Sequence, residues 1–201
     1  VIPILSEVGT STYDNNYQRF YERSGAAHNT FQIAKAKNSK FGKLNWLEPL
    51  DIFGTFYAGN KPQPLKKRFK KISNNKYFIS GSHDGLKRFG IWHIRNIEIE
   101  LTTENILLLK ISDEVNSRTP FSWRIWNHLG PSIDKKLLNQ TIEENKSKYN
   151  SKHKWHKTNF AVGFGQNIER NSLELSGESL QNFGNFECNY IFDKNKFLLE
   201  N

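Results

Sequence analysis

The feature that most constrains the fold is a pair of strand-like segments separated by a short polar break. Residues 91–101 alternate apolar and polar side chains, most regularly from residue 97, which is typical of a strand with one buried face. Residues 102–105 are polar, and residues 106–112 return to an apolar run. Two such runs joined by a few polar residues predict an antiparallel hairpin.

The rest of the chain follows the same rhythm of strand and turn. Clusters of Gly, Asn and Ser separate further strand candidates at residues 29–34, 77–82, 121–126, 160–164, 172–175 and 186–192. No segment before residue 134 has helical periodicity, and a short helix is predicted only at residues 136–144. The sequence therefore predicts an all-β fold, a large antiparallel, supersandwich-like β-sandwich with at most one short helix.

Composition narrows the classes of protein further. The 201 residues are enough for one domain with a real core, and 13% aromatic residues argue against disorder. No apolar run approaches the ~18 residues of a membrane helix, and no secretion signal opens the segment. The single Cys188 excludes an internal disulfide framework and a Cys-rich zinc module. The lack of Met and the initial Val1 predict a processed chain or a C-terminal fragment.

The chain is basic, with 29 Lys and Arg against 20 acidic residues and a formal net charge of +9. Such a charge favours anionic partners, but the Lys and Asn enrichment of an AT-rich genome explains it equally well. Residues 61–71, a basic stretch containing two prolines, have two interpretations: a protected strand edge or a polyanion-binding patch. Residues 66–71 carry no signature of RNA or DNA binding, so we expect no nucleic-acid partner.

Histidines provide the remaining candidates for chemistry. After the predicted helix, the sequence to residue 157 predicts a mobile basic loop that contains His153 and His156. Two histidines three residues apart can share a metal, but no third ligand is nearby, which favours a solvated loop. His28, His83 and His128 each lie in motif-like surroundings, although a structural role is the alternative for each of them.

Several motifs occur in a characteristic order along the chain. They are Glu7 to Tyr13, Tyr21 to Ser24 leading into Ala27-His28-Asn29-Thr30, Ser82-His83-Asp84-Gly85 followed by His93-x-Arg95, and Asn127 to Pro131. Together they resemble the C-terminal β-domain of heparinase II/III-type polysaccharide lyases. The Ala-His-Asn-Thr run is the most specific part, and residues 162–165 fit the looser tail of the family.

The resemblance implies that residues 1–201 form a β-sandwich domain that follows an upstream helical toroid domain. It implies β-elimination on uronic-acid-containing acidic polysaccharide, in a periplasmic or secreted protein. That reaction must neutralise the uronate carboxylate, remove the adjacent proton and protonate the leaving oxygen. In the family most of the groups that do this lie on the toroid. The β-domain forms one wall of the substrate cleft and helps to hold a metal, usually zinc.

Carried onto this sequence, the resemblance places metal ligands at Glu7 and His28. Glu7 stands where the family usually has Asp, and a further His ligand is expected upstream of Val1, so the zinc site would be incomplete here. Tyr13 and Tyr21 are the catalytic candidates, with packing as the alternative for each. The substrate-binding candidates are Arg23, Asn29, Lys67 and Arg68. His83 and His128 are interpreted as organisers of a turn and a strand.

The rival hypothesis is a stand-alone carbohydrate-binding β-sandwich without catalytic activity. Its sugar-stacking platforms would be sought among Trp92, Trp123, Trp126 and Trp155. Within the lyase hypothesis the identity of the polysaccharide, and whether the protein degrades or builds it, stay open.

Overall fold

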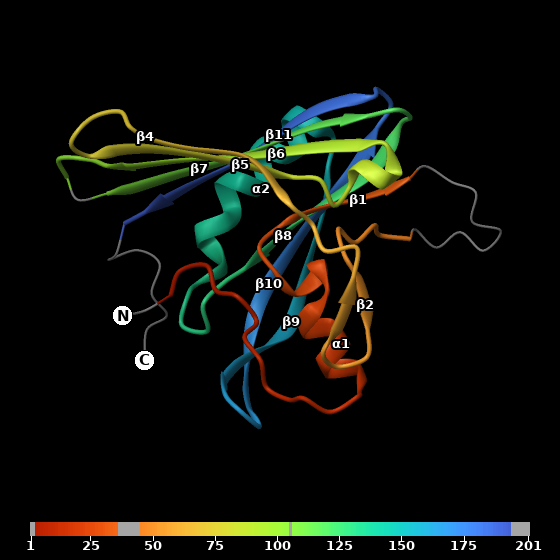
Figure 1. Cartoon of the computed structure of the whole chain (residues 1–201). Coiled ribbons are helices and arrows are strands. Elements are labelled where there is room, and N and C mark those ends of the chain that lie inside the picture. The colour runs from red at the N-terminus through yellow and green to blue at the C-terminus, as the bar shows by residue number, and fades with distance from the viewer. Residues whose placement is uncertain (1–2, 36–44, 105, 194–201) are drawn as a thin grey trace.

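The computed structural model describes residues 3–35, 45–104 and 106–193. This part of the chain folds into two packed antiparallel sheets and one small hairpin (Figure 1). The predicted all-β sandwich is thereby confirmed.

The larger sheet contains five strands in the order β11-β7-β6-β5-β4. Its central pair is the hairpin that the sequence predicted, with Ile97 of one strand opposite Ile111 of the other. The strands are β4 (Pro64–Lys71), β5 (Lys76–His83), β6 (Ile91–Leu101), β7 (Leu107–Ser117) and β11 (Phe183–Phe192).

The smaller sheet contains four strands in the order β1-β8-β10-β9. They are β1 (Phe31–Lys35), β8 (Phe121–His128), β9 (Lys152–Gly163) and β10 (Gln166–Ser179). The core lies between the two sheets, where the ring of Phe186 from β11 lies 4.9 Å from that of Phe31 and 4.7 Å from that of Trp123. Burial of such large apolar side chains is the main source of stability in a sandwich.

The two edges of the five-stranded sheet are protected in different ways. Helix α2 (Asn139–Tyr149), which follows the 3₁₀ turn η3 (Lys135–Leu138), covers the edge of β11. Thr141 Oγ1 donates to the carbonyl oxygen of Asn189 at 2.5 Å, and Asn145 Nδ2 donates to that of Glu187 at 3.1 Å. At the opposite edge, β4 is exposed along its whole length and is rich in Lys, a charge pattern that discourages edge-to-edge pairing.

The structure differs from the sequence prediction before residue 134, where a two-turn helix, α1 (Tyr17–Arg23), is present. The side chain of Asn16 caps it by accepting from the backbone N–H of Arg19 at 3.0 Å. Seven residues are too few to show a helical period, and this explains why no helix was predicted there. The other short elements are η1 (Gly25–Ala27), β2 (Asp51–Phe53), β3 (Tyr57–Gly59) and η2 (Lys87–Phe89).

The predicted mobile loop after the helix is wrong, because its histidines lie in strand β9. His153 pairs with Leu175, and His156 pairs with Ser172, on the neighbouring strand β10. Residues three apart on a strand point to opposite faces, so these two histidines do not converge on a metal. His156 instead lies 3.1 Å from a carboxylate oxygen of Glu174.

None of the described helices is long and apolar enough to span a membrane.

Candidate functional site

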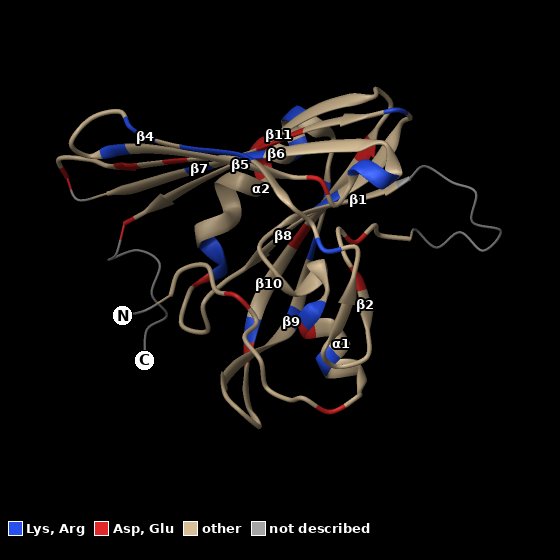
Figure 2. Ribbon diagram, viewed as in Figure 1, with Lys and Arg blue, Asp and Glu red and all other residues tan. Residues whose placement is uncertain are grey.

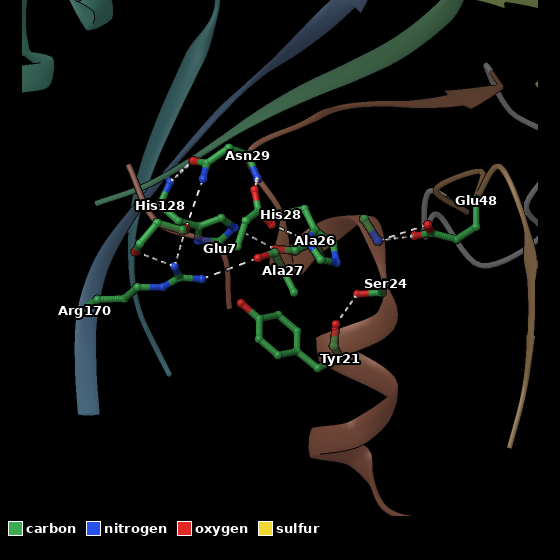
Figure 3. A network of polar contacts seen from close by, with 12 residues as sticks. Glu7, Tyr21, Ser24, Ala26, Ala27, His28, Asn29, Glu48, His128 and Arg170 are labelled. Carbon is green, nitrogen blue, oxygen red and sulfur yellow. Dashed lines mark hydrogen bonds and ion pairs between the residues drawn. The ribbon is translucent and has the colours of Figure 1, made fainter. Parts of the chain in front are cut away.

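Glu7 and His28 meet at the surface of the smaller sheet. The carboxylate of Glu7 is hydrogen-bonded to Nδ1 of His28, and both side chains are about half exposed (Figure 3). Burial opposes ionisation of Glu7, but the contact with His28 outweighs it and lowers the carboxyl pKa. The same hydrogen bond raises the pKa of His28 above its ordinary value. The pair therefore favours a carboxylate–imidazolium state.

The turn that carries His28 is held rigidly from several sides. Polar side chains from different parts of the fold bond to backbone groups on both sides of His28: Glu48 to the Gly25 N–H, His128 to the Ala26 oxygen, Arg170 to the Ala27 oxygen and Arg95 to the Asn29 oxygen. A site on a loop becomes well defined only when such supports fix its backbone. The turn before His28 is therefore preorganised.

His128 is one of these supports and is fully buried. Its Nε2 donates to the Ala26 oxygen at 3.0 Å, and its Nδ1 lies 2.7 Å from the Ser172 hydroxyl, which donates to it. Burial, helped by the positive charge of Arg170, lowers the pKa of His128 to about 3. The imidazole is thus neutral and organises the strand, as the sequence analysis expected. His83 organises its turn by accepting from the Gly85 N–H at 3.2 Å.

Arg170 is the support that sequence reasoning missed. Its guanidinium, 1% exposed, donates to the Ser6 carbonyl oxygen at 2.5 Å, to the Ser6 hydroxyl at 2.9 Å and to Thr158 Oγ1 at 3.2 Å. Burial lowers its pKa. In the sequence, Arg170 is one basic residue in a polar stretch, and nothing local distinguishes it from exposed arginines.

Tyr21 points from α1 toward Arg170 (Figure 3). Its hydroxyl is buried, and the side chains of Thr158 and Arg170 lie close enough to it to lower its pKa. Burial raises the pKa of this phenol, while the nearby positive charge of Arg170 opposes the rise. Tyr21 is thus the catalytic candidate that the structure brings into the His28 network.

Tyr13, the other catalytic candidate, belongs to a separate exposed aromatic cluster. Its ring is 51% exposed and lies 5.4 Å from that of Phe56 and 5.2 Å from that of Phe164. The guanidinium of Arg19 lies over the Tyr13 ring, 5.2 Å from its centre. Nothing in these contacts connects Tyr13 with the Glu7–His28 pair.

The substrate-binding candidates divide into two groups. Arg23 ends α1 and donates to the carbonyl oxygens of Gly54 at 2.7 Å and Tyr57 at 3.0 Å. Asn29 uses its side chain internally, donating to the Ser6 oxygen and accepting from the His128 N–H. Lys67 and Arg68 are distant in sequence from Arg23 and Asn29 and lie on the exposed edge strand β4.

A cavity of about 250 Å³ adjoins this site and is lined in part by Arg23, His28, Glu48, His83 and His93. Burial raises the pKa of Glu48 and lowers that of His83. The cavity therefore lies between the turn that carries His28 and residues at the end of β5 and the start of β6.

The donor set at Glu7 and His28 fits a metal only in part. A carboxylate and an imidazole are suitable zinc ligands and lie side by side, but a structural zinc ion normally has four ligands. Among the residues that the structure describes, no group of three His, Cys, Asp or Glu side chains could hold a metal ion. The described residues therefore supply at most half of such a site.

Fold and site together define an antiparallel β-sandwich domain with a clamped carboxylate–imidazole pair at its surface. The family profile described as "Heparinase II/III-like, C-terminal" matches residues 2–183. The chain therefore belongs to the heparinase II/III-like family, through its C-terminal domain, and the resemblance seen in the sequence is confirmed.

Solved structures share the fold. The heparan sulfate lyase HepC from Pedobacter heparinus is similar with a TM-score of 0.61 and 12% identity, over 96% of this chain and 29% of that chain. The heparinase III BT4657 gene product is similar with a TM-score of 0.61 and 12% identity, over 95% of this chain and 28% of that chain. This chain thus spans less than a third of their length. No curated protein sequence matches it.

Proposed function

We propose that this chain is the β-domain of a polysaccharide lyase that cleaves uronic-acid-containing acidic polysaccharide by β-elimination, forming one wall of its substrate cleft. The observation that carries the proposal is the preorganised turn with His28 and its partner Glu7, in a chain that the family profile matches almost throughout. The name of one solved neighbour, a heparan sulfate lyase, supports the same reaction class. A helical toroid domain of the same protein, in the periplasm or outside the cell, would complete the cleft.

In this proposal Glu7 and His28 contribute two ligands to a zinc ion, and other parts of the whole protein supply the rest. Bound zinc would fix the cleft wall and add positive charge close to the acidic sugar. Glu7 is already ionised beside His28, whereas the imidazolium of His28 would have to release a proton to become a ligand. Supports such as Arg170 keep the turn in place.

Tyr21 and Tyr13 are the proposed proton-transfer groups. β-Elimination needs a group that removes a proton and a group that returns one to the leaving oxygen. Burial raises the pKa of the Tyr21 phenol despite the nearby cation of Arg170, so the neutral phenol would serve as the group that gives a proton to the leaving oxygen. Tyr13 has an exposed ring and would act only if the substrate reaches the aromatic cluster.

Charge would bring the substrate to this wall. Arg23 lines the cavity beside His28 and would pair with a uronate carboxylate or a sulfate there, while Asn29 fixes the geometry next to it. Lys67 and Arg68 add to a net charge of +9, which attracts a polyanion over long range.

The test compares the whole-length protein with this 201-residue chain on a panel of uronate-containing polysaccharides. β-Elimination creates a carbon–carbon double bond, so ultraviolet absorbance rises as the glycan is cleaved. We expect the rise with the longer protein only, and the polysaccharide that gives it identifies the substrate. No rise from either protein, on any member of the panel, would refute the lyase proposal.

The second candidate is a stand-alone carbohydrate-binding sandwich. A cavity of about 500 Å³, lined in part by Trp46, Tyr149, Lys152 and Leu180, favours it, because sugars stack on aromatic side chains. Two of the platforms expected from the sequence are buried, since Trp123 is 1% exposed and Trp126 is 7% exposed, whereas Trp92 is 41% exposed and stays a candidate. Retention of glycan without any double-bond product from the whole-length protein would favour this candidate.

A further inference from the structure

We propose that the inner face of the edge of the five-stranded sheet, formed by β4 and β5, is an extended binding track for a linear acidic polysaccharide that leads to the cavity beside His28. The choice of a glycan rests on the proposed function. The existence of the track rests on charge, register and exposure.

The charge is concentrated on one strand. All eight residues of β4 are exposed, and five of them are cations: Lys66, Lys67, Arg68, Lys70 and Lys71. Figure 2 shows Lys and Arg along this edge of the sheet. Within the described residues none of the five forms an ion pair, although lysines elsewhere on the same sheet do, such as Lys76 with Glu100 and Lys110 with Glu187. The edge therefore holds positive charge that is available to a ligand.

The register divides these cations between two faces. Lys67, Phe69 and Lys71 pair with Gly81, Ile79 and Tyr77, and this row continues across the sheet to the core-facing side chains. Arg68 and Lys70 pair with Ser80 and Phe78 and point to the opposite face. The contacts agree, because Phe69 stacks on Tyr77 with 6.0 Å between ring centres, and Arg68 lies over the Phe78 ring.

The inner face combines the two features that an acidic sugar polymer requires. Phe69 is 68% exposed and Ile79 is 38% exposed, so the stacked rings of Phe69 and Tyr77 offer an apolar platform for a sugar ring. Lys67 and Lys71 flank this platform and can pair with carboxylates or sulfates of successive sugars. The outer face has its own cations, Arg68 and Lys70, but lacks this stacked aromatic pair.

The track also has a direction. Pro64 at the start of β4 pairs with His83 at the end of β5, and His83 lines the same cavity as His28 and His93. Seven steps of ~3.3 Å make β4 about 23 Å long, so Lys71 lies roughly that far from the Pro64 end. A polymer that follows the inner face from Lys71 past Lys67 therefore arrives at the cavity. The track would bind the part of the polysaccharide that lies beyond the bond to be cleaved.

The test measures binding of the 201-residue chain to heparin as the probe, using a long heparin chain and a heparin disaccharide at low salt. The double variant Lys67→Gln/Lys71→Gln removes two cations from the inner face. The matched control, Arg68→Gln/Lys70→Gln, removes two cations from the same strand on the outer face. Circular dichroism and size-exclusion chromatography confirm that each variant is folded and does not self-associate.

We expect the inner-face variant to lose about tenfold or more in affinity for the long chain, equivalent to ~1.4 kcal/mol. The control should lose clearly less, and disaccharide binding should change equally in both variants. Phe69→Ala should also weaken binding of the long heparin chain, because it removes the aromatic ring without changing the charge. These three results together support the track.

Equal losses in the two double variants would overturn the proposal and leave only long-range attraction by net charge. No loss in either would leave β4 as a protected edge. Tighter binding of single-stranded DNA than of heparin, with the same dependence on Lys67 and Lys71, would overturn the glycan as the ligand. None of these outcomes depends on cleavage, so they are independent of the double-bond assay that tests the lyase proposal.

Discussion

The guanidinium of Arg95 donates to the carbonyl oxygen of Asn29 at 2.6 Å and so links the two sheets at the functional site. Arg95 lies in β6 of the larger sheet, whereas Asn29 follows His28 and precedes β1 of the smaller sheet. Asp113 holds the guanidinium with two hydrogen bonds of 2.8 Å, and His93 Nε2 lies 2.6 Å from the same carboxylate. An ion pair with a buried carboxylate in one sheet thus positions the turn of the other.

Removing Asp113 should destabilise the whole domain. Burial alone would raise the pKa of this carboxyl, but Arg95 and His93 hold it well below its ordinary value. Asp113→Ala leaves the Arg95 guanidinium, whose side chain is 21% exposed, without its carboxylate partner, at a cost of about 3 kcal/mol in the free energy of unfolding. Urea denaturation measures this loss.

The matched control for Asp113 is Glu169→Ala, which breaks the exposed ion pair between Glu169 and Lys157. Exposed pairs contribute little, so its effect should stay below about 1 kcal/mol. If Asp113→Ala were as mild as this control, Arg95 would not depend on its carboxylate partner.

Lowering the pH should reduce the folding stability of the domain, because His128 is buried in its neutral form. Its pKa is about 3 in the folded protein against ~6.5 in an unfolded chain, so the unfolded state takes up a proton first as the pH falls. The stability contributed by the neutral imidazole is therefore complete above pH ~6.5 and is lost progressively between pH ~6.5 and ~3. Urea unfolding at a series of pH values measures this slope, and NMR should show no His128 titration above pH ~4. Titration near pH 6.5 would contradict the neutral, buried assignment.

Metal content tests the roles of Glu7 and His28. The whole-length protein should contain about one zinc per chain, and His28→Ala should lose it because an imidazole ligand is removed. Glu7→Asp, which retains a carboxylate, should keep the metal. His153→Ala is the control, since His153 lies in β9 and takes no part in the network around His28. Elemental analysis gives the answer, and unchanged zinc in His28→Ala would refute the assignment.

Regular local patterns made the strands predictable from sequence. The alternation in β6 reflects one half-buried face, so the hairpin with β7 followed directly from the residues. The interpretation of residues 61–71 as a Lys-protected edge also agrees with β4, because the local chemistry of an edge is visible in sequence. The Ala-His-Asn-Thr run led to the family, which the profile match confirms.

What the sequence could not provide depends on contacts between distant residues. Strand β9 is polar enough to resemble a loop, and its pairing with β10 overrides that local preference. Arg170 becomes a support of the His28 turn only because β10 brings it against Ser6, which is 164 residues away in the chain. Glu48 likewise reaches the Gly25 N–H only in the folded state. Such supports carry no local signal.

A small change at Gly130 should disturb the site through the N-terminal segment. A Cβ atom at this position would overlap the carbonyl oxygen of Pro3, and the Gly130 N–H donates to the Ile4 oxygen at 2.9 Å. Because the obstacle is backbone, Gly130→Ala must displace the segment that leads to Glu7, at a cost of about 1–3 kcal/mol in unfolding free energy. Gly81→Ala is the control, since its Cβ would meet no atom within 4 Å, and its effect should stay within about 0.5 kcal/mol. Urea denaturation compares the two, and equal stabilities would mean that the N-terminal segment is not fixed against Gly130.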